Sequence, residues 1–240
     1  ATVIDVGINR EPDGLVGDHS AFLEWGWLAS LEESGCASGE SGWLPQHLTL
    51  AGGAFDPQAV FGRVAPLTLE IGFGMGQTLI EMAQAAPERD FIGIEIHKPG
   101  IAQLCFDAGS RNLANLRCYG EDAVQVLEEC FADGSIDTLQ LFFPDPWQKA
   151  RHHKRRFVRP DLIALVRRKL RIGGRFHMAT DWAPYAEWML EHMEAAPGFA
   201  NAHSPGAYHP RPDWRPLTKF EKRGHNQGHG TWDLIYERID

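Results

Sequence analysis

The chain has few cysteines and no long apolar run. Its four cysteines, in 240 residues, include no C-x-x-C pair, which argues against a disulfide scaffold and predicts reduced thiols in a core. The longest apolar runs, such as LQLFF, fall far short of the roughly 20 residues that a membrane-spanning helix needs. The first residues also lack the basic-then-apolar order of a signal peptide. We therefore expect a cytoplasmic protein with no membrane contact.

Positive charge is scarce everywhere except in one stretch. The net charge is −9, yet residues 149–175 hold eleven Lys and Arg against one acid, so the other 213 residues carry a net −19. Such a local basic region in an acidic protein indicates contact with a polyanion such as a nucleic-acid backbone. A solvated helix end is the preferred explanation for Arg167, Arg168, Lys169 and Arg171, because cations suit the last turn of a helix, but it does not explain residues 151–156 as readily.

Strand and helix patterns alternate from residue 66 onward. Expected strands at 66–72, 90–96, 115–119, 137–143 and 175–180 are separated by amphipathic helical segments, and 231–239 alternates as a closing strand. The pattern predicts an α/β fold, a Rossmann-like doubly wound, mostly parallel sheet with helices on both faces and a closing antiparallel strand. We expect a poorly determined N-terminal extension at 1–42 and one domain at 43–240.

A glycine loop follows the first of these strands. In EIGFGMGQT, the glycines are Gly72, Gly74 and Gly76. A dinucleotide fingerprint needs its third glycine one place later, so the G-x-G-x-x-G register fails. Ligands of such sheets bind at the carboxyl ends of the strands, and we expect the site there.

Three carboxylates stand at or just after successive strand ends. Glu70 ends the first strand, Glu95 ends the second, and Asp122 follows the third. Three carboxylates at one edge of the sheet repel a pyrophosphate. They can bind S-adenosylmethionine, which carries a sulfonium, an ammonium and a ribose diol. Glu95 lies 19 residues beyond Gly76, where a carboxylate often accepts ribose hydroxyls. Each acid alone is better explained as a surface or capping residue, but three of them at successive strand ends beside a glycine loop favour this cofactor class.

The fourth strand ends in FFPDPW, followed by the run QKARHHKRR. Two prolines stiffen a turn that presents Asp145 and Trp147, an acceptor and an aromatic face of the kind that binds a purine. A rigid turn with a packing tryptophan is the simpler explanation, but the adjacent basic run favours RNA. We expect Lys149, Arg151, Lys154, Arg155 and Arg156 to bind the RNA backbone, and we interpret His152 and His153 as backbone contacts or solvated residues rather than catalysts.

Near the end, Thr218 stands three residues before Glu221. This spacing equals a helix capping box. His225 and His229 have metal-pair spacing, but the surrounding glycines argue against a rigid helix and no third ligand is apparent. We predict no metal.

The motifs LEIGFGMG, FIGIEIH, FFPDPWQKARHHKRR, GGRFHMATDW, RPLTKFEKRGH and GHGTWDL occur in that order. Together they resemble the bacterial tRNA (guanine-N7-)-methyltransferase family, which methylates the variable-loop guanine at tRNA position 46. The resemblance runs from about Trp43 to the end. It implies that S-adenosyl-L-methionine is the cofactor and tRNA the partner. It implies cofactor-binding roles for Glu70, Glu95, Asp122 and Asp145, a catalytic role for Asp145, and substrate-binding roles for Lys149, Asp181, Thr218, Lys219, Phe220 and Glu221.

Two departures from the family pattern are visible. Gln148 replaces the usual His, and residues 1–42 hold one Arg and eight acids where members tend to carry an Arg-rich arm. Two alternatives stay open. The chain is a non-catalytic RNA-binding module of the same fold, or it is a methyltransferase that acts on another base or on a protein nitrogen. A monomer and a homodimer both stay open.

Overall fold

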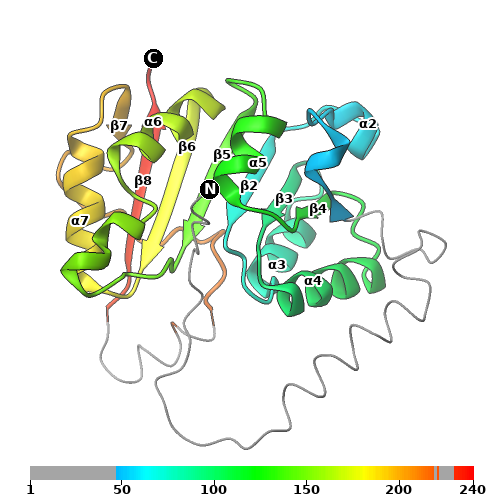
Figure 1. Ribbon diagram of the computed structural model, residues 1–240, viewed down its shortest axis with the longest axis horizontal. Helices are drawn as coiled ribbons and strands as arrows, with labels where there is room; N and C mark the ends of the chain where they lie inside the picture. Colours follow the sequence, from blue (N-terminus) through cyan, green and yellow to red (C-terminus); the bar gives the residue numbers. More distant parts are fainter. Residues whose placement is uncertain (1–46, 219–220, 222–229) are drawn as a thin grey trace, which may run out of the picture.

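The computed structural model describes residues 47–218, 221 and 230–240. Within them, one sheet has the order β1-β4-β3-β2-β5-β6-β8-β7 (Figure 1). Strands β1 to β6 are parallel to one another, and β8 is antiparallel to both β6 and β7. This arrangement confirms the predicted doubly wound sheet and its antiparallel closing strand. The strands are β1 (His47–Leu48), β2 (Leu67–Ile71), β3 (Asp90–Ile94), β4 (Leu116–Tyr119), β5 (Ile136–Phe142), β6 (Leu170–Thr180), β7 (Phe199–Asn201) and β8 (Trp232–Arg238).

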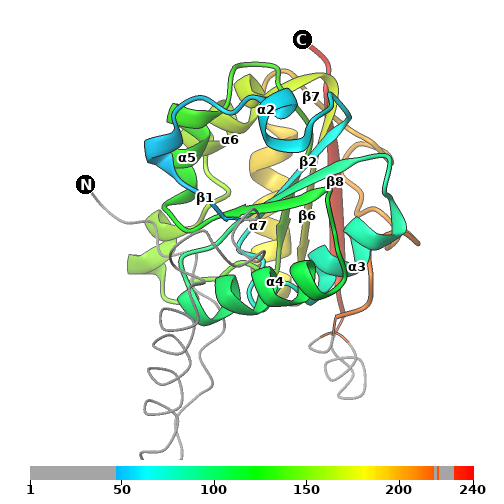
Figure 2. The same ribbon diagram turned by 90° about the vertical axis from the view of Figure 1, so that its right-hand side faces the viewer.

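Helices cover both faces of the sheet. Buried side chains of α3 and α4 form one core with Phe91, Leu116 and Phe142, whereas those of α5, α6 and α7 form a second core. Figure 2 shows α5 and α6 on one side of the sheet and α3 on the other. Every residue of β2 and β3 is buried, as expected for parallel strands covered on both faces. The helices are α2 (Pro57–Phe61), α3 (Gln77–Ala85), α4 (Lys98–Ser110), α5 (Ala123–Cys130), α6 (Pro160–Lys169) and α7 (Ala183–Glu194), with 3₁₀ helices η3 (Leu50–Gly52) and η4 (Ala150–Arg155).

The start of β6 differs from the sequence prediction. Two consecutive glycines usually end a helix, so the sequence predicts a helix stop at Gly173 and Gly174 and a strand that begins at 175. The helix ends at Lys169, and Leu170 already pairs with Ile136 on β5. The register shifts just after that pair, and Gly173 has φ 75°, a left-handed conformation that favours glycine. These glycines therefore form an irregularity inside the strand rather than a helix stop.

Three cysteines lie in the described part of the chain, and Cys105, Cys118 and Cys130 are all free thiols. No helix in this part is long and apolar enough to cross a membrane. The predicted N-terminal extension at 1–42 and the pair His225 and His229 lie outside the described residues.

Candidate functional site

The glycine loop after β2 lies at the switch point of the sheet. Strand β2 is flanked by β3 on one side and β5 on the other, and all three are parallel. Gly72, Gly74 and Gly76 have φ values of 76°, 59° and 77°. All three are left-handed, so the loop conformation itself requires glycine. The chain then enters α3 with Gly76 as the N-cap.

The loop packs closely against α4, a contact that the sequence did not reveal. A Cβ on Gly100 would come within 2.0 Å of the backbone oxygen of Gly74. A Cβ on Gly76 would come within 2.4 Å of Leu104 Cδ1. Because Gly100 would meet backbone, this position has little freedom to accommodate a larger residue.

Glu95 fixes the loop from the end of β3. Its Oε2 accepts a hydrogen bond from the Gly74 amide at 2.9 Å, and its Oε1 accepts from the amides of Ile96 and His97 at 2.7 and 3.0 Å. A carboxylate offers about four acceptor positions. Three are used by the backbone, which leaves room on Oε2 for a hydroxyl donor such as one from a ribose.

Glu70 is a buried carboxyl group that lacks a full set of partners. It is 3% exposed, and its Oε2 has no hydrogen-bond partner among residues 47–218, 221 and 230–240. Burial, followed by repulsion from Glu95, raises the pKa of Glu70 to about 8. A buried acid in this condition is suited to a cationic or hydrogen-donating ligand, which would supply the missing interaction.

Asp122 is placed as a helix cap. Its side chain accepts hydrogen bonds from the amides of Val124 at 2.9 Å and Gln125 at 3.2 Å, at the start of α5. The capping explanation is therefore confirmed, whereas the cofactor-binding role of Asp122 stays a prediction. The neighbouring Glu121, which the sequence reasoning missed, accepts from Leu50 N through Oε1, and its Oε2 is buried with no partner within the described ranges.

These residues fit S-adenosylmethionine. A glycine loop leaves the backbone accessible, Glu95 retains an acceptor, and Glu70 places an unsatisfied acid beside it. The acids match the hydroxyl donors and the two positive charges of this cofactor better than they match a phosphate.

The turn after β5 is strained at both ends. Phe143 has φ 51° and Trp147 has φ 43°, left-handed values that cost non-glycine residues about 1–3 kcal/mol each. Between them, Asp145 accepts a hydrogen bond from Trp147 N at 2.9 Å. Phe143 N donates to Ala179 O on β6 at 2.8 Å. The strain indicates that surrounding contacts hold the turn in a defined shape.

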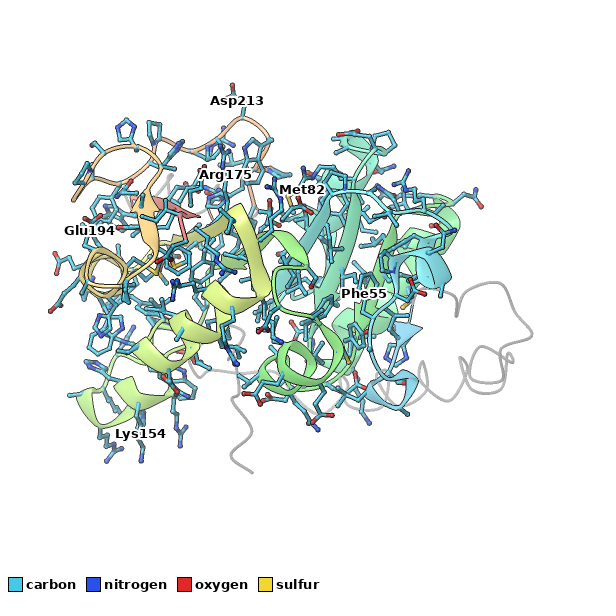
Figure 3. All side chains as sticks on the ribbon, turned by 90° about the horizontal axis from the view of Figure 1, so that it is seen from above. Phe55, Met82, Lys154, Arg175, Glu194 and Asp213 are labelled. Carbon is cyan, nitrogen blue, oxygen red and sulfur yellow. The ribbon has the colours of Figure 1, made fainter. Side chains whose placement is uncertain are left out.

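The basic run forms η4, and most of its cations face solvent. Arg151, Lys154 and Arg155 are exposed, as is the preceding Lys149. Nitrogen-bearing side chains project outward around Lys154 (Figure 3). The Arg155 guanidinium lies 4.7 Å from the Trp147 ring centroid, a cation–π contact beside the turn.

The two histidines of the run are only partly exposed. The His152 ring meets the edge of Trp147 at 5.8 Å, and His153 meets Trp188 at 5.4 Å. Desolvation, followed by nearby cations, lowers the pKa of His152, which disfavours a positive charge there. Direct RNA contact by either histidine stays a prediction.

Arg156, which the sequence also predicts to contact RNA, is buried. It is 3% exposed, so it offers almost no surface to a phosphate. Its Nε donates to Pro146 O at 2.9 Å, and its guanidinium lies over the rings of Tyr185 and Trp188. The local sequence does not predict that Arg156 is buried and Arg155 exposed, because both belong to the same basic run.

Of the other predicted substrate-binding residues, one follows β6 and the rest lie in the segment before β8. Asp181, half-buried, directly follows β6. Thr218 and Glu221 form the reciprocal capping box that their spacing predicted, with Thr218 N to Glu221 Oε2 at 2.9 Å and Glu221 N to Thr218 Oγ1 at 3.0 Å. Lys219 and Phe220 lie outside the described residues.

A buried ionic network behind this box was missed by the sequence analysis. Arg215 pairs with both carboxylate oxygens of Glu221 and with Asp233 on β8, and Asp233 also contacts His177 on β6 at 2.7 Å. The Arg215 guanidinium lies 5.6 Å from the Phe143 ring, which connects the network to the strained turn. Its members are 6 to 56 residues apart in the chain, so no local pattern links them.

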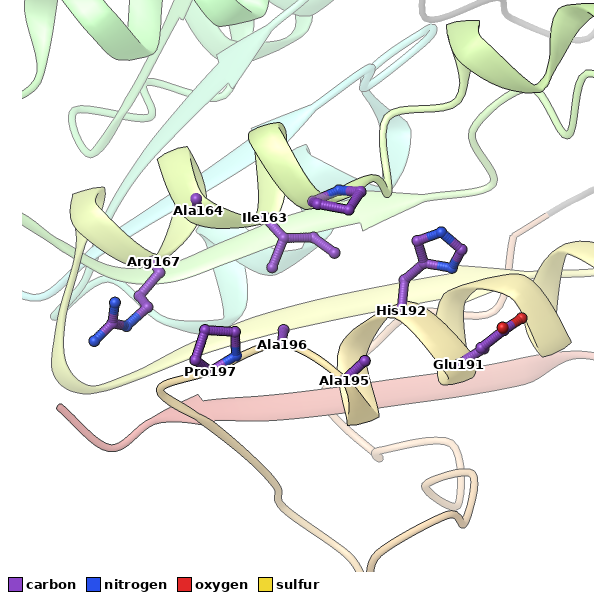
Figure 4. Close-up of a pocket in the computed structure, with 9 residues that line it drawn as sticks. Ile163, Ala164, Arg167, Glu191, His192, Ala195, Ala196 and Pro197 are labelled. Atoms are coloured by element: carbon purple, nitrogen blue, oxygen red, sulfur yellow. The ribbon is translucent and has the colours of Figure 1, made fainter.

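A groove of about 310 Å³ lies elsewhere, between α6 and α7. Figure 4 shows Ile163 and Arg167 on one side and Ala195 and Ala196 on the other. None of its lining residues belongs to the predicted cofactor, substrate or RNA set.

Comparison with known sequences gives a consistent family. A family model described as a methyltransferase matches residues 64–234. The tRNA (guanine-N(7)-)-methyltransferase of Pseudomonas entomophila is 61% identical over 193 residues, covering 80% of each chain. That of Pseudomonas putida is 54% identical over 230 residues, covering 95% of this chain and 96% of the relative. A shorter match, at residues 8–65, is to a FemAB-like model of peptidoglycan biosynthesis and recognition.

Solved structures agree on the fold. The 16S rRNA methyltransferase KamB has a TM-score of 0.56 at 15% identity, covering 76% of this chain and 92% of the other. The antibiotic-resistance methyltransferase Kmr has a TM-score of 0.53 at 16% identity, covering 77% and 92%. At these identities the likeness concerns the fold alone.

Proposed function

The chain belongs to the tRNA (guanine-N(7)-)-methyltransferase family, and we propose that it methylates nitrogen-7 of the variable-loop guanine at tRNA position 46. The observation that supports this most is the juxtaposition of two features at the sheet's carboxyl edge. The acid-lined glycine loop follows β2, and the strained Asp145 turn with its basic helix follows the adjacent β5.

Glu95, Glu70 and the glycine loop would hold the cofactor. Glu95 has an acceptor position for a ribose hydroxyl, and Glu70 would ionise beside a positive charge. When bound, S-adenosylmethionine supplies an electrophilic methyl group on a sulfonium sulfur. Residues Gly72, Gly74 and Gly76 keep the backbone clear of side chains on this side of the site.

Nitrogen-7 of guanine has an in-plane lone pair and no proton, so the reaction needs no general base. The protein's task is therefore alignment of the base and exclusion of water. Asp145, on its rigid turn, would accept hydrogen bonds from the guanine and stabilise the positive charge that develops on the ring. Asp181 and Thr218 would complete this half of the site.

The exposed cations of η4 would bind the tRNA backbone. Arg151, Lys154 and Arg155 face solvent directly behind the turn, while the rest of the chain is acidic. Phosphate contacts of this kind set the position of an RNA and carry little sequence information. The basic helix would therefore orient the tRNA, and the turn would select the base.

The test is incubation of the chain with labelled S-adenosylmethionine and a tRNA transcript, followed by nucleoside analysis. The expected product is 7-methylguanosine, and a transcript with adenine at position 46 should accept no methyl group. Label in another nucleoside, or undiminished 7-methylguanosine in the altered transcript, would contradict the proposal. Absence of label with folded protein would favour a non-catalytic RNA-binding module.

A further inference from the structure

We infer that Arg156 is a positioning residue that holds the Asp145 turn in the shape needed for methyl transfer, and that it does not contact RNA. This inference rests on the proposed role of Asp145 in guanine binding. It separates Arg156 from the adjacent Arg155, although the two are identical side chains in one basic run.

The turn depends on contacts from outside itself. Phe143 and Trp147, which flank the Pro-Asp-Pro segment, both have left-handed backbones that L residues rarely adopt. The Asp145 contact to Trp147 N lies within the turn. The Nε of Arg156 donates to Pro146 O at 2.9 Å, from ten residues further along the chain. Because Pro146 lies between Asp145 and Trp147, this bond fixes the carbonyl next to the proposed guanine contact.

Arg156 is itself held by α7. Its guanidinium carbon lies 4.9 Å from the centroid of the Tyr185 ring and 4.7 Å from that of Trp188. Trp188 is fixed in turn, because its Nε1 donates to Val158 O at 2.7 Å. A planar guanidinium can contact aromatic faces and still direct one N–H at a carbonyl, which an ammonium group cannot do with the same geometry.

This arrangement links two predicted site carboxylates. Asp145 lies on the turn after β5, and Asp181 lies between β6 and the start of α7. Arg156 joins that turn to Tyr185 and Trp188, in the first half of α7. We therefore expect its loss to disturb the spacing of Asp145 and Asp181 without removing a phosphate contact.

The test compares three variants: Arg156→Lys, Arg156→Ala and Arg155→Ala. The measurements are the single-turnover rate of methyl transfer at saturating tRNA, and the salt dependence of tRNA binding without turnover. Arg156→Lys should lower the rate by about tenfold or more, while tRNA affinity and its salt slope stay unchanged. Arg155→Ala should weaken binding and reduce the salt slope by about 0.7–0.9.

Trp188→Leu tests the same contact from α7. It should lower the rate of methyl transfer like Arg156→Lys. The double variant should have a rate close to that of either single variant, because both substitutions remove the same contact between Arg156 and Trp188. Arg168→Lys, an exposed arginine at the end of α6, is the matched control and should behave as wild type. Thermal unfolding checks that each variant folds. If Arg156→Ala does not fold, Arg156→Lys alone tests the inference.

A wild-type rate in Arg156→Lys, or a salt slope in Arg156→Ala that falls as in Arg155→Ala, would overturn the inference. Full additivity of Arg156→Lys and Trp188→Leu would also overturn it. Failure of the proposed function is a separate result, since the wild-type protein itself would then form no 7-methylguanosine.

Discussion

Arg215 and Glu221 form a two-pronged ion pair in the protein interior. Arg215 Nη1 lies 2.8 Å from Glu221 Oε2, Nη2 lies 2.7 Å from Oε1, and neither side chain is exposed. On its other edge the same guanidinium pairs with Asp233 of β8, at 2.8 Å from Nε. The capping box of Thr218 and Glu221 is thus tied directly to the sheet, close to the turn that follows β5.

Replacing Arg215 with Met should destabilise the protein strongly. The change leaves Glu221 and Asp233 buried without their cation, and breaking a buried pair in this way costs about 3–5 kcal/mol. Urea unfolding gives the free energy of unfolding. Arg175→Met is the matched control, because Arg175 is largely exposed and lies 3.6 Å from Glu237, and such surface pairs contribute about 0–1 kcal/mol. Equal losses in the two variants would contradict the importance of the buried network.

Asp145→Asn should lower methyl transfer with little effect on tRNA binding. The asparagine oxygen can still accept from Trp147 N, so the turn keeps its shape while the negative charge near the guanine is lost. We expect the single-turnover rate to fall by about tenfold to a hundredfold, measured with saturating tRNA and cofactor. Asp161→Asn, on the exposed start of α6, is the control. An unchanged rate in Asp145→Asn would remove this residue from the mechanism.

The exposed cations of η4 should set the salt dependence of tRNA binding. Replacing Arg151, Lys154 and Arg155 together with Ala should weaken binding and reduce the slope of log K against log salt by roughly two units or more, because each phosphate contact contributes about 0.7–0.9. Filter binding or fluorescence anisotropy across a salt series measures this. The triple Ala variant of Arg167 and Arg168, in the last turn of α6, and Arg171, at the start of β6, is the control for total charge. An unchanged slope in the first variant would place the RNA contact elsewhere.

Cofactor affinity should rise with pH through the titration of Glu70. Because the pKa of Glu70 is raised to about 8, the carboxyl is largely protonated at pH 6–7 in the free protein. A cationic ligand favours the ionised form, so binding releases a proton, and the affinity should increase between pH 6 and 8 and level off above that. Calorimetry in buffers of different ionisation enthalpy measures the proton release.

Glu70→Gln provides the control for this pH effect. The amine of the cofactor titrates in both proteins, so the difference between them reports Glu70 alone. The variant should bind more weakly at pH 8 and release fewer protons. Identical pH profiles for the two proteins would show that Glu70 does not titrate on binding.

Gly100→Ala should disrupt the cofactor loop although Gly100 lies outside it. The added Cβ would approach Gly74 O to 2.0 Å, which forces α4 and the loop apart. We expect weakened cofactor binding, by about tenfold or more, and a lower midpoint of thermal unfolding. Gly52→Ala is the control, because a Cβ there would meet nothing within 4 Å. Wild-type affinity in Gly100→Ala would mean that the loop tolerates displacement.

The local part of the fold followed from the sequence, as the β2 region shows. Alternation of Leu67, Leu69 and Ile71, then glycines, then the helical pattern from Gln77, predicted strand, loop and helix in the right order. The start of β6 was mispredicted, because two glycines usually end a helix, whereas here they accommodate a register shift against β5. The short β1 and β7 have too few residues to show a period.

Local geometry at the candidate site followed from the sequence, whereas the binding roles of these residues stay predictions. Thr218 and Glu221 make the capping box that their spacing implied, and Asp122 caps α5. Burial that depends on tertiary packing had no such local signal. Arg155 and Arg156 are adjacent and alike, but Arg156 is buried against Tyr185 and Trp188 of α7, whereas Arg155 is exposed.

The most direct test of the account uses a synthetic tRNA with 7-deazaguanine at position 46. This base keeps the hydrogen-bonding groups of guanine on its Watson–Crick edge but has carbon in place of nitrogen-7, so it lacks the lone pair that accepts the methyl group. With labelled S-adenosylmethionine, the account predicts that this tRNA binds like the normal transcript and receives no methyl group, whereas the normal transcript yields 7-methylguanosine. Methylation of the 7-deaza tRNA to the same extent would contradict the central claim.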